Sequence, residues 1–487
     1  MNKLDAEGFR LPIKIDSTSN GEFEPIPVSK ANQRANRLAL ESATVNARRT
    51  GQTRRQFLVS SCGAASTLLA FNQVNALNHK TGGFFDINAE SALDKFAAAE
   101  QVEGGEFIFD VQGHYVNPDG DWLSRVPDSA RPYSNFEKAR CELAEQPGNR
   151  SYLECLSAGE FIKDVFLDSD TDIMVLSFVP STREMEPVTI EEADATRQIV
   201  ADLEGSKRLM IHGRVNPNQE GDLEAMDELA ERWNISAFKT YTQFGPGGVG
   251  FFLHDDAGIA MIERARQLGV RNICVHKGLP FGPQSIEHSR CNDIGIVARR
   301  FPDMNFLVYH SGFVADVPEG EFEEGAGRAG IDTLIQSLID NDIQPNSNVY
   351  AELGSTWRFL MRDPDNAAHA MGKLLRYVGE DSVLWGTDSI WYGSPQDQIQ
   401  AFRAFQISPE FRERYGYPEI TPALRRKVFG LNAAVPYQIN EAEIRTHTAN
   451  DTVAVQRRNY LENPQPSFLT YGPKNRREFL NLLKLGG

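Results

Sequence analysis

The sequence predicts a closed (β/α)₈ TIM barrel, and three observations support this prediction. Between residues 107 and 405, eight short apolar segments alternate with stretches of helical length. Continuous apolar strands that alternate with helices indicate a parallel sheet covered on both faces. Polar side chains stand where these strands end, and barrels carry their active sites at the carboxyl ends of the strands. A doubly wound open sheet is the alternative, but no Gly-x-Gly-x-x-Gly motif follows the first strand.

The barrel is expected to span residues 107–440. Strands are expected at 107–111, 172–179, 208–214, 235–241, 272–276, 305–310, 349–353 and 383–387. Helices are expected at 152–166, 190–203, 221–233, 257–268, 291–300, 331–339, 358–378, 396–405 and 421–439. After the first strand, residues 115–170 are rich in Pro, Asp and aromatic residues, which predicts a long loop that caps the site. Residues 441–487 are expected to form a C-terminal helical arm that covers the barrel or contacts another subunit.

The first 76 residues predict an export signal. Residues 1–50 are polar and lack a clear period, and Thr53-Arg54-Arg55-Gln56-Phe57-Leu58 then precedes a mildly apolar run that ends near Phe71. The small residues Val74-Asn75-Ala76 are typical of a cleavage site. This order resembles a twin-arginine signal with a long leading region, which predicts the twin-arginine export machinery as a partner and the periplasm as the location. A basic helix start in a soluble protein is the alternative. Residues 77–106 are expected to be a linker.

Charge and hydropathy exclude two classes of partner. The formal net charge of −17 and the pI of about 5.1 argue against nucleic acid and against an anionic membrane surface. No apolar run is long enough for a membrane span. A small-molecule substrate is therefore the expected partner, and assembly into a homo-oligomer stays open.

The ends of the predicted strands carry most of the candidate site residues. Four of the nine histidines in the chain lie at such ends, which is hard to explain if they are ordinary core residues. Imidazole and carboxylate groups that converge on one rim are the ligands that a divalent cation such as zinc requires. In strand order the candidates are Gln112 and His114, His212 and Arg214, Lys239, His276, His310, Glu352, and Asp388.

Several short motifs occur at these strand ends. They are Phe109-Asp-Val-Gln-Gly-His114, Val275-His276, Tyr309-His-Ser-Gly312 and Leu384-Trp-Gly-Thr-Asp388, with Phe429-Gly-Leu-Asn432 in a closing helix. Together they resemble the amidohydrolase-related branch of the amidohydrolase superfamily, which includes the aminocarboxymuconate-semialdehyde decarboxylase group. The resemblance implies one divalent metal ion, zinc in the first place and manganese as the alternative. It implies His114, His276 and Asp388 as metal ligands and His310 as the catalytic acid/base, with Asp388 as the other candidate for activating water.

Gln112 departs from the His or Glu that the family has at this position. A neutral amide is a poorer zinc ligand than imidazole or carboxylate, so Gln112 is a doubtful ligand. Arg214, Lys239 and Glu352 are expected to bind substrate, although Lys239 has a second interpretation as a carboxylated bridge between two metals. The resulting hypothesis is a metal-dependent hydrolase of a small carboxylated molecule. A non-oxidative decarboxylase and a metal-free barrel with a binding role are the two alternatives.

Overall fold

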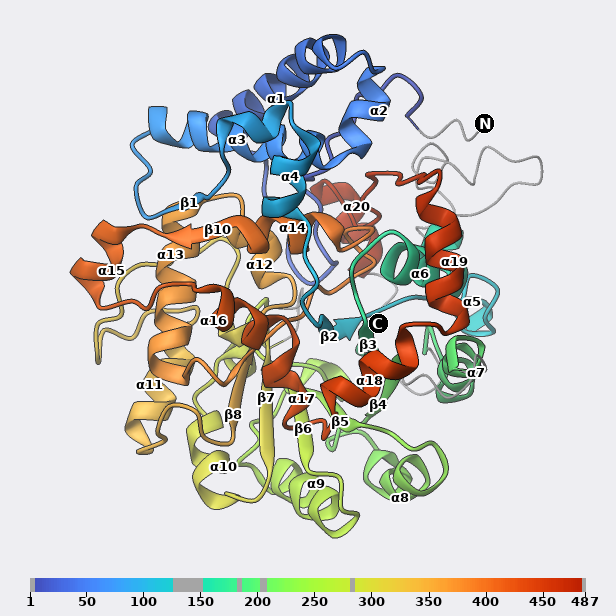
Figure 1. The fold of residues 1–487 in the computed structure, drawn as a ribbon. Helices are drawn as coiled ribbons and strands as arrows, with labels where there is room; N and C mark the ends of the chain where they lie inside the picture. Colours follow the sequence, from blue (N-terminus) through green and yellow to red (C-terminus); the bar gives the residue numbers. More distant parts are fainter. Residues whose placement is uncertain (1–4, 126–151, 182–185, 202–207, 281–284, 484–487) are drawn as a thin grey trace.

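Eight parallel strands form a closed barrel in the computed structural model, which describes residues 5–125, 152–181, 186–201, 208–280 and 285–483 (Figure 1). The strands neighbour one another in chain order: β2 (Phe109–Gly113), β3 (Ile173–Leu176), β4 (Leu209–Arg214), β5 (Ala237–Tyr241), β6 (Asn272–His276), β7 (Asn305–Tyr309), β8 (Val349–Glu352) and β9 (Val383–Leu384). The backbone N–H groups of Val111 and Asp388 donate to the carbonyls of Trp385 (3.0 Å) and Gln112 (3.0 Å), which closes the barrel between β9 and β2. The predicted (β/α)₈ barrel is confirmed.

Helices cover the outside of the barrel and follow the strands in the expected order. They are α7 (Ile190–Ala201), α8 (Asp222–Arg232), α9 (Asp256–Gln267), α10 (Ile294–Arg300), α11 (Asp332–Asp340), α12 (Thr356–Leu360), α13 (Pro364–Lys373), α14 (Gln396–Ala404), α15 (Pro409–Tyr415), α16 (Pro422–Arg426) and α17 (Asn432–Ala434). Strand positions are almost all buried, because the helices cover the outside of the sheet and apolar side chains fill the inside. Phe109, Val175, Leu307 and Leu384 belong to one of these apolar clusters.

The segment after the first strand contains helical turns as well as loop. Its described parts are α5 (Trp122–Arg125), η5 (Tyr152–Leu156), α6 (Ala158–Ile162) and a π-helical turn, η6 (Lys163–Leu167). Residues 126–151 of the expected cap lie outside the described residues. The predicted helix at 152–166 is therefore present as three short helical pieces.

The N-terminal residues form helices that pack against the barrel. They are α1 (Lys30–Arg49), α2 (Arg54–Val59) and α3 (Ser61–Leu77), which pack on one another at the top of Figure 1, and α3 contacts α14. The sequence showed no clear period in residues 1–50 because the buried stripe of α1 consists of Ala35, Ala39, Ala43 and Ala47, which carry little hydrophobic signal. The mildly apolar run after Arg55 is buried within this fold.

Residues 77–106, expected as a linker, also contain ordered elements. β1 (Gly83–Phe85) pairs antiparallel with β10 (Phe405–Ile407), and η1 (Ala89–Ala92) precedes α4 (Lys95–Val102). The Asp94 side chain caps α4 by accepting from the N–H groups of Phe96 and Ala97. A three-residue strand and an eight-residue helix are too short to produce a recognisable period.

The C-terminal residues form the predicted helical arm, with α18 (Glu441–Thr448), α19 (Thr452–Leu461) and α20 (Arg476–Leu483). A buried ion pair of 2.5 Å between Arg208 and Asp451 fastens the arm to the barrel. Among the described residues, no helix combines the length and the apolar character that crossing a membrane requires.

Candidate metal centre

The structure brings five of the predicted site residues together at the carboxyl ends of the strands. The Nε2 atom of His114 lies 3.1 Å from Oδ1 of Asp388, and the rings of His276 and His310 have centroids 4.5 Å apart. Gln112 lies between them, with its Nε2 atom 3.2 Å from Asp388 Oδ1, 3.3 Å from His114 Nε2 and 3.5 Å from His310 Nε2. All five side chains are buried.

Backbone carbonyls fix the tautomers of the three histidines. The outer nitrogens contact carbonyl oxygens: His114 Nδ1 with Ser177 (2.7 Å), His310 Nδ1 with Gly354 (2.7 Å) and His276 Nε2 with Leu279 (3.3 Å). A carbonyl only accepts, so each outer nitrogen carries the proton and each inner nitrogen turns a lone pair toward the site. Metal-binding histidines are held by hydrogen bonds of this kind.

Three residues around the site adopt the left-handed backbone region. The φ angles of His310, Ser355 and Asp388 are 63°, 53° and 58°. Such conformations cost about 1–3 kcal/mol each for residues other than Gly, and they gather at active sites. At these three positions the strained backbone directs a side chain toward the mouth of the barrel.

Asp388 stays ionised despite its burial. Burial alone would raise the pKa of this carboxyl, but its contacts with His114 and with the Ser355 hydroxyl lower the pKa by more, so the net pKa is below its ordinary value. The second carboxylate oxygen accepts from Asn20 Nδ2 (2.6 Å) and Ser355 Oγ (2.6 Å). For His310, burial lowers the pKa to about 4, which favours the neutral imidazole. The arrangement therefore offers a carboxylate and a neutral imidazole side by side.

His212 does not reach this group. Its Nε2 atom lies 3.3 Å from Tyr437 Oη, 3.4 Å from Tyr309 Oη and 3.7 Å from Cys274 Sγ. Burial lowers the pKa of His212 well below its ordinary value. The sequence placed this histidine at the rim, whereas the structure places it among aromatic side chains, where an uncharged imidazole contributes to packing.

Arg214 and Glu352, two of the expected substrate-binding residues, have partners inside the protein. Arg214 forms ion pairs of 2.6 Å with Glu186 and 3.0 Å with Asp222. Glu352 accepts from the backbone N–H groups of His310 (2.9 Å) and Gly354 (2.5 Å). Glu352 therefore orients the loop that carries His310, and these contacts favour positioning roles for both residues.

The ammonium of Lys239, the third residue of that group, has no hydrogen-bond partner among the described residues. The group is fully buried and lies 3.7 Å from the centre of the Tyr309 ring. Burial lowers the pKa of Lys239 to about 8, while the charges of Glu22, Glu352 and Asp388 counteract this shift. Burying an ammonium without a hydrogen-bond acceptor is unfavourable, so an anion bound beside Lys239 would stabilise its charged form.

Two residues from the N-terminal segment also enter the site, and the sequence did not predict them. Glu22 Oε1 lies 3.2 Å from His276 Nδ1, and Glu22 Oε2 lies 3.6 Å from His310 Nε2. Asn20 Nδ2 donates to both Glu22 and Asp388. Among the described residues, Glu22, His276 and His310 form the one group of His, Cys, Asp or Glu side chains whose ligand atoms all lie within 4.8 Å of each other.

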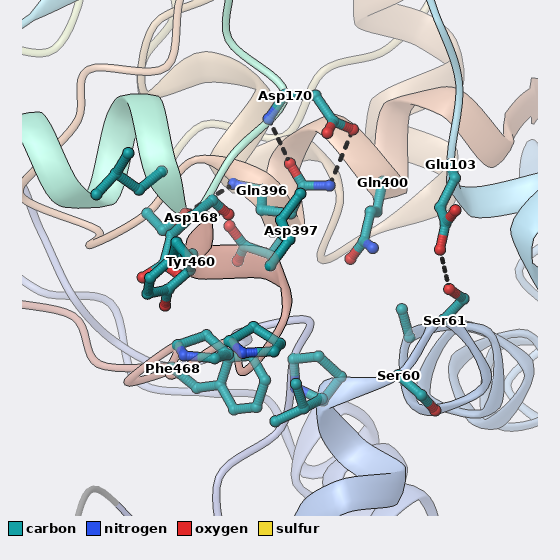
Figure 2. A pocket seen from close by; sticks show the side chains of 18 of the residues that line it. Ser60, Ser61, Glu103, Asp168, Asp170, Gln396, Asp397, Gln400, Tyr460 and Phe468 are labelled. Carbon is teal, nitrogen blue, oxygen red and sulfur yellow. Dashed lines mark hydrogen bonds between the residues drawn. The ribbon is translucent and has the colours of Figure 1, made fainter. Parts of the chain in front are cut away.

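A cavity of about 330 Å³ lies elsewhere, between α3, α14 and α19 (Figure 2). Its polar groups pair with each other: Gln396 bonds Asp170, Ser61 bonds Glu103, and Tyr460 bonds Asp168. Lys14 and Asp397, which also line it, form an ion pair. This cavity marks the junction between the N-terminal segment and the barrel, and none of the predicted site residues lines it.

Several solved structures resemble the chain. They include 5-carboxyvanillate decarboxylase from Sphingomonas paucimobilis (12% identity, TM-score 0.41, covering 69% of this chain and 100% of that one). The same enzyme from Novosphingobium aromaticivorans, complexed with manganese and 4-hydroxy-3-methoxy-5-nitrobenzoic acid, shows 14% identity and a TM-score of 0.45, covering 70% and 97%. 2,6-Dihydroxybenzoate decarboxylase from Rhizobium shows 13% identity and a TM-score of 0.37, covering 69% and 99%. A comparison with curated proteins gave no match.

The family comparison covers most of the barrel. The family model described as amidohydrolase matches residues 163–438, which begin before β3 and end after α17. The N-terminal segment with Asn20 and Glu22 lies outside the matched region, as does β2 with Gln112 and His114. Because the match extends over more than half of the 487 residues, the chain belongs to the amidohydrolase family.

Proposed function

We propose that this protein is a divalent-metal-dependent hydrolase that acts on a small carboxylated molecule. The observation that carries the proposal is the convergence of three imidazole nitrogens with the Asp388 carboxylate. The outer N–H of each ring donates to a backbone carbonyl, so each inner nitrogen keeps a lone pair that can bind a cation or accept a proton. Nitrogen and carboxylate donors suit both zinc and manganese.

The residues suit a metal ion, and they separate metal binding from proton transfer. When bound, the ion would act as a Lewis acid toward the substrate and lower the pKa of water. His114, His276 and Asp388 would hold it, as predicted from the sequence. His310 has its Nδ1 proton held by Gly354, so its Nε2 atom is placed to accept a proton from the attacking water and return it to the leaving group.

The buried ammonium of Lys239 favours a substrate that carries a carboxylate. Within the described parts of the chain this ammonium has no hydrogen-bond acceptor, although Glu22, Glu352 and Asp388 lie near enough to influence its pKa. A substrate carboxylate would supply the missing acceptor and strengthen the interaction in a site of low polarity. We therefore expect Lys239→Met to raise the KM for carboxylated substrates and to have less effect on neutral ones.

The same feature favours a second candidate, a non-oxidative decarboxylase. A carboxylate that is held between Lys239 and a metal ion would also be oriented for loss of carbon dioxide. The test is a panel of aromatic acids, lactones and amides, with carbon dioxide release and hydrolysis product measured in the same reactions. Carbon dioxide release without hydrolysis would show that the decarboxylase, and not the hydrolase, is the correct candidate.

Metal analysis of protein that was purified without chelator or added metal decides whether either enzyme is correct. About one equivalent of zinc or manganese is expected. A folded protein that binds no divalent ion, even when the ion is in large excess, would refute both candidates and leave the metal-free barrel.

Export through the twin-arginine pathway is part of the proposal, because Arg54 and Arg55 are followed by an apolar run.

A further inference from the structure

We infer that Glu22 is a metal ligand, supplied by the N-terminal segment in place of the acid that strand β2 lacks at Gln112. The inference rests on the proposed function, because it concerns the same ion. It goes further by assigning a ligand outside the region that matches the family, and by making the buried segment of residues 11–23 part of the working enzyme.

The Glu22 carboxylate lies close to two histidine nitrogens of the site. Four ligand atoms placed 2.0–2.1 Å from an ion in a tetrahedron are separated by roughly 3.4 Å. Glu22 lies 3.2 Å from His276 Nδ1 through one carboxylate oxygen and 3.6 Å from His310 Nε2 through the other. The first separation is that of neighbouring ligands around one ion, and the second places the same carboxylate beside the proposed acid/base His310. The lone pairs of both histidine nitrogens face the carboxylate, because both outer nitrogens donate to carbonyls.

Gln112 does not supply this ligand. Its amide nitrogen donates to Asp388 Oδ1 (3.2 Å), while its amide oxygen has no hydrogen-bond partner among the residues that the structure describes. In this orientation Gln112 presents hydrogen atoms to the surrounding acceptors and does not offer a lone pair to a cation. A divalent ion held by histidines and Asp388 alone would keep a net charge of +1 in a buried site, which is unfavourable. The Glu22 carboxylate would neutralise that charge.

The segment that carries Glu22 is packed into the protein. Residues 11–23 are almost entirely buried although they form no helix or strand. Asp16 forms an ion pair with Arg358 (3.0 Å), Ser19 N–H donates to Pro473 (2.9 Å), and the rings of Phe23 and Phe359 have centroids 4.6 Å apart. The barrel on one side and the C-terminal arm on the other therefore hold Glu22 in place.

Isosteric variants test the assignment through metal affinity, measured by competition with a chelator for Mn²⁺ and Zn²⁺. Glu22→Gln should weaken binding by more than the roughly 10–100-fold that is lost when a group behind a ligand is removed. Gln112→Glu in the Glu22→Gln background should restore much of the loss, because it returns a carboxylate to the centre. Glu24→Gln is the matched control: Glu24 lies two residues along the same segment, and its exposed carboxylate contacts Arg476.

A second variant and a mass measurement complete the test. Glu22→Asp keeps the charge but withdraws the carboxylate by one methylene, so it should also weaken binding, and it replaces Glu22→Gln if that variant does not fold. Intact mass of native, metal-loaded protein should show that residue 22 is retained. Parent-like affinity in Glu22→Gln, or full metal binding in protein that was cleaved after Ala76, would overturn the inference.

The outcomes also separate this inference from the proposed function. If the parent binds the ion and turns over substrate while Glu22→Gln does so equally well, only the inference fails. Tighter binding or faster turnover in Glu22→Gln would show that the segment blocks the site, which also overturns the inference. If the folded parent binds neither Mn²⁺ nor Zn²⁺, the proposed function itself fails.

Discussion

Replacement of Lys14 by Met should both destabilise the protein and weaken the metal site. The Lys14 ammonium donates to the carbonyls of Tyr392 (2.7 Å) and Ser394 (2.7 Å) and lies 3.4 Å from Asp397 Oδ1. The side chains of Lys14 and Asp397 are only 6% and 1% exposed. Met has a similar length but no charge, so the change leaves a buried carboxylate without its cation.

The size of the effect follows from this burial. Removing one partner of a buried ion pair costs about 3–5 kcal/mol, because the other charge stays in a site of low polarity. Asp397 would keep one donor, the backbone N–H of Lys14 at 3.1 Å, which places the expected loss toward the lower end of that range. Lys14 lies eight residues before Glu22, so release of this anchor should also reduce metal affinity.

The measurement is the free energy of unfolding of Lys14→Met, Asp397→Asn and the double variant, with metal affinity determined in parallel. Lys30→Met is the control, since Lys30 is exposed at the start of α1. The double variant should lose less than the sum of the single losses, because the residues interact directly. If Lys14→Met and Lys30→Met have the same free energy of unfolding, the Lys14–Asp397 ion pair does not anchor the N-terminal segment.

Three further changes give separate tests of the site, of the pH response and of export. Asp388→Asn should reduce turnover to background and weaken metal binding while the thermal midpoint shifts little; retained turnover with any accepted substrate would contradict its role. His369 lies among the rings of Phe411, Tyr415 and Tyr417, and burial lowers its pKa from the usual 6.5 to about 4. Between these values the unfolded chain binds a proton that the folded protein does not, so the free energy of unfolding should fall as the pH drops from 6.5 to 4, and His369→Gln should flatten that decline. Replacing Arg54 and Arg55 by Lys should hold the protein in the cytoplasm, and normal appearance in the periplasm would argue against the twin-arginine route.

The strands could be predicted because their signal is local. Asn305–Tyr309 and Ala237–Tyr241 are strands in the structure within a residue or two of the expected ranges, since apolar runs of this length bury themselves in a parallel sheet. The expected strand at 383–387 is reduced to Val383–Leu384, because the chain turns toward the left-handed conformation of Asp388. His212 was misplaced because position along a strand does not tell which layer of the barrel interior a side chain fills.

The N-terminal segment could not be predicted for a different reason. Residues 11–23 are fixed by hydrogen bonds and ion pairs to residues more than 300 positions away, and such contacts leave no period in the sequence. The alanine stripe of α1 and the short α4 were missed for a related reason, because small or short elements depend on tertiary packing for most of their stability.

Gln112 was nevertheless a signal that pointed beyond the barrel. A family site that loses a carboxylate must bind its ion more weakly, change the ion, or obtain the charge from another part of the chain. The structure places Glu22 at ligand spacing from His276 and beside His310, which favours the third solution. That solution constrains the export prediction as well, because cleavage after Ala76 would remove the carboxylate. An exported enzyme that depends on Glu22 must therefore keep its leading region, and the paired arginines would then act within a folded N-terminal unit that is not discarded.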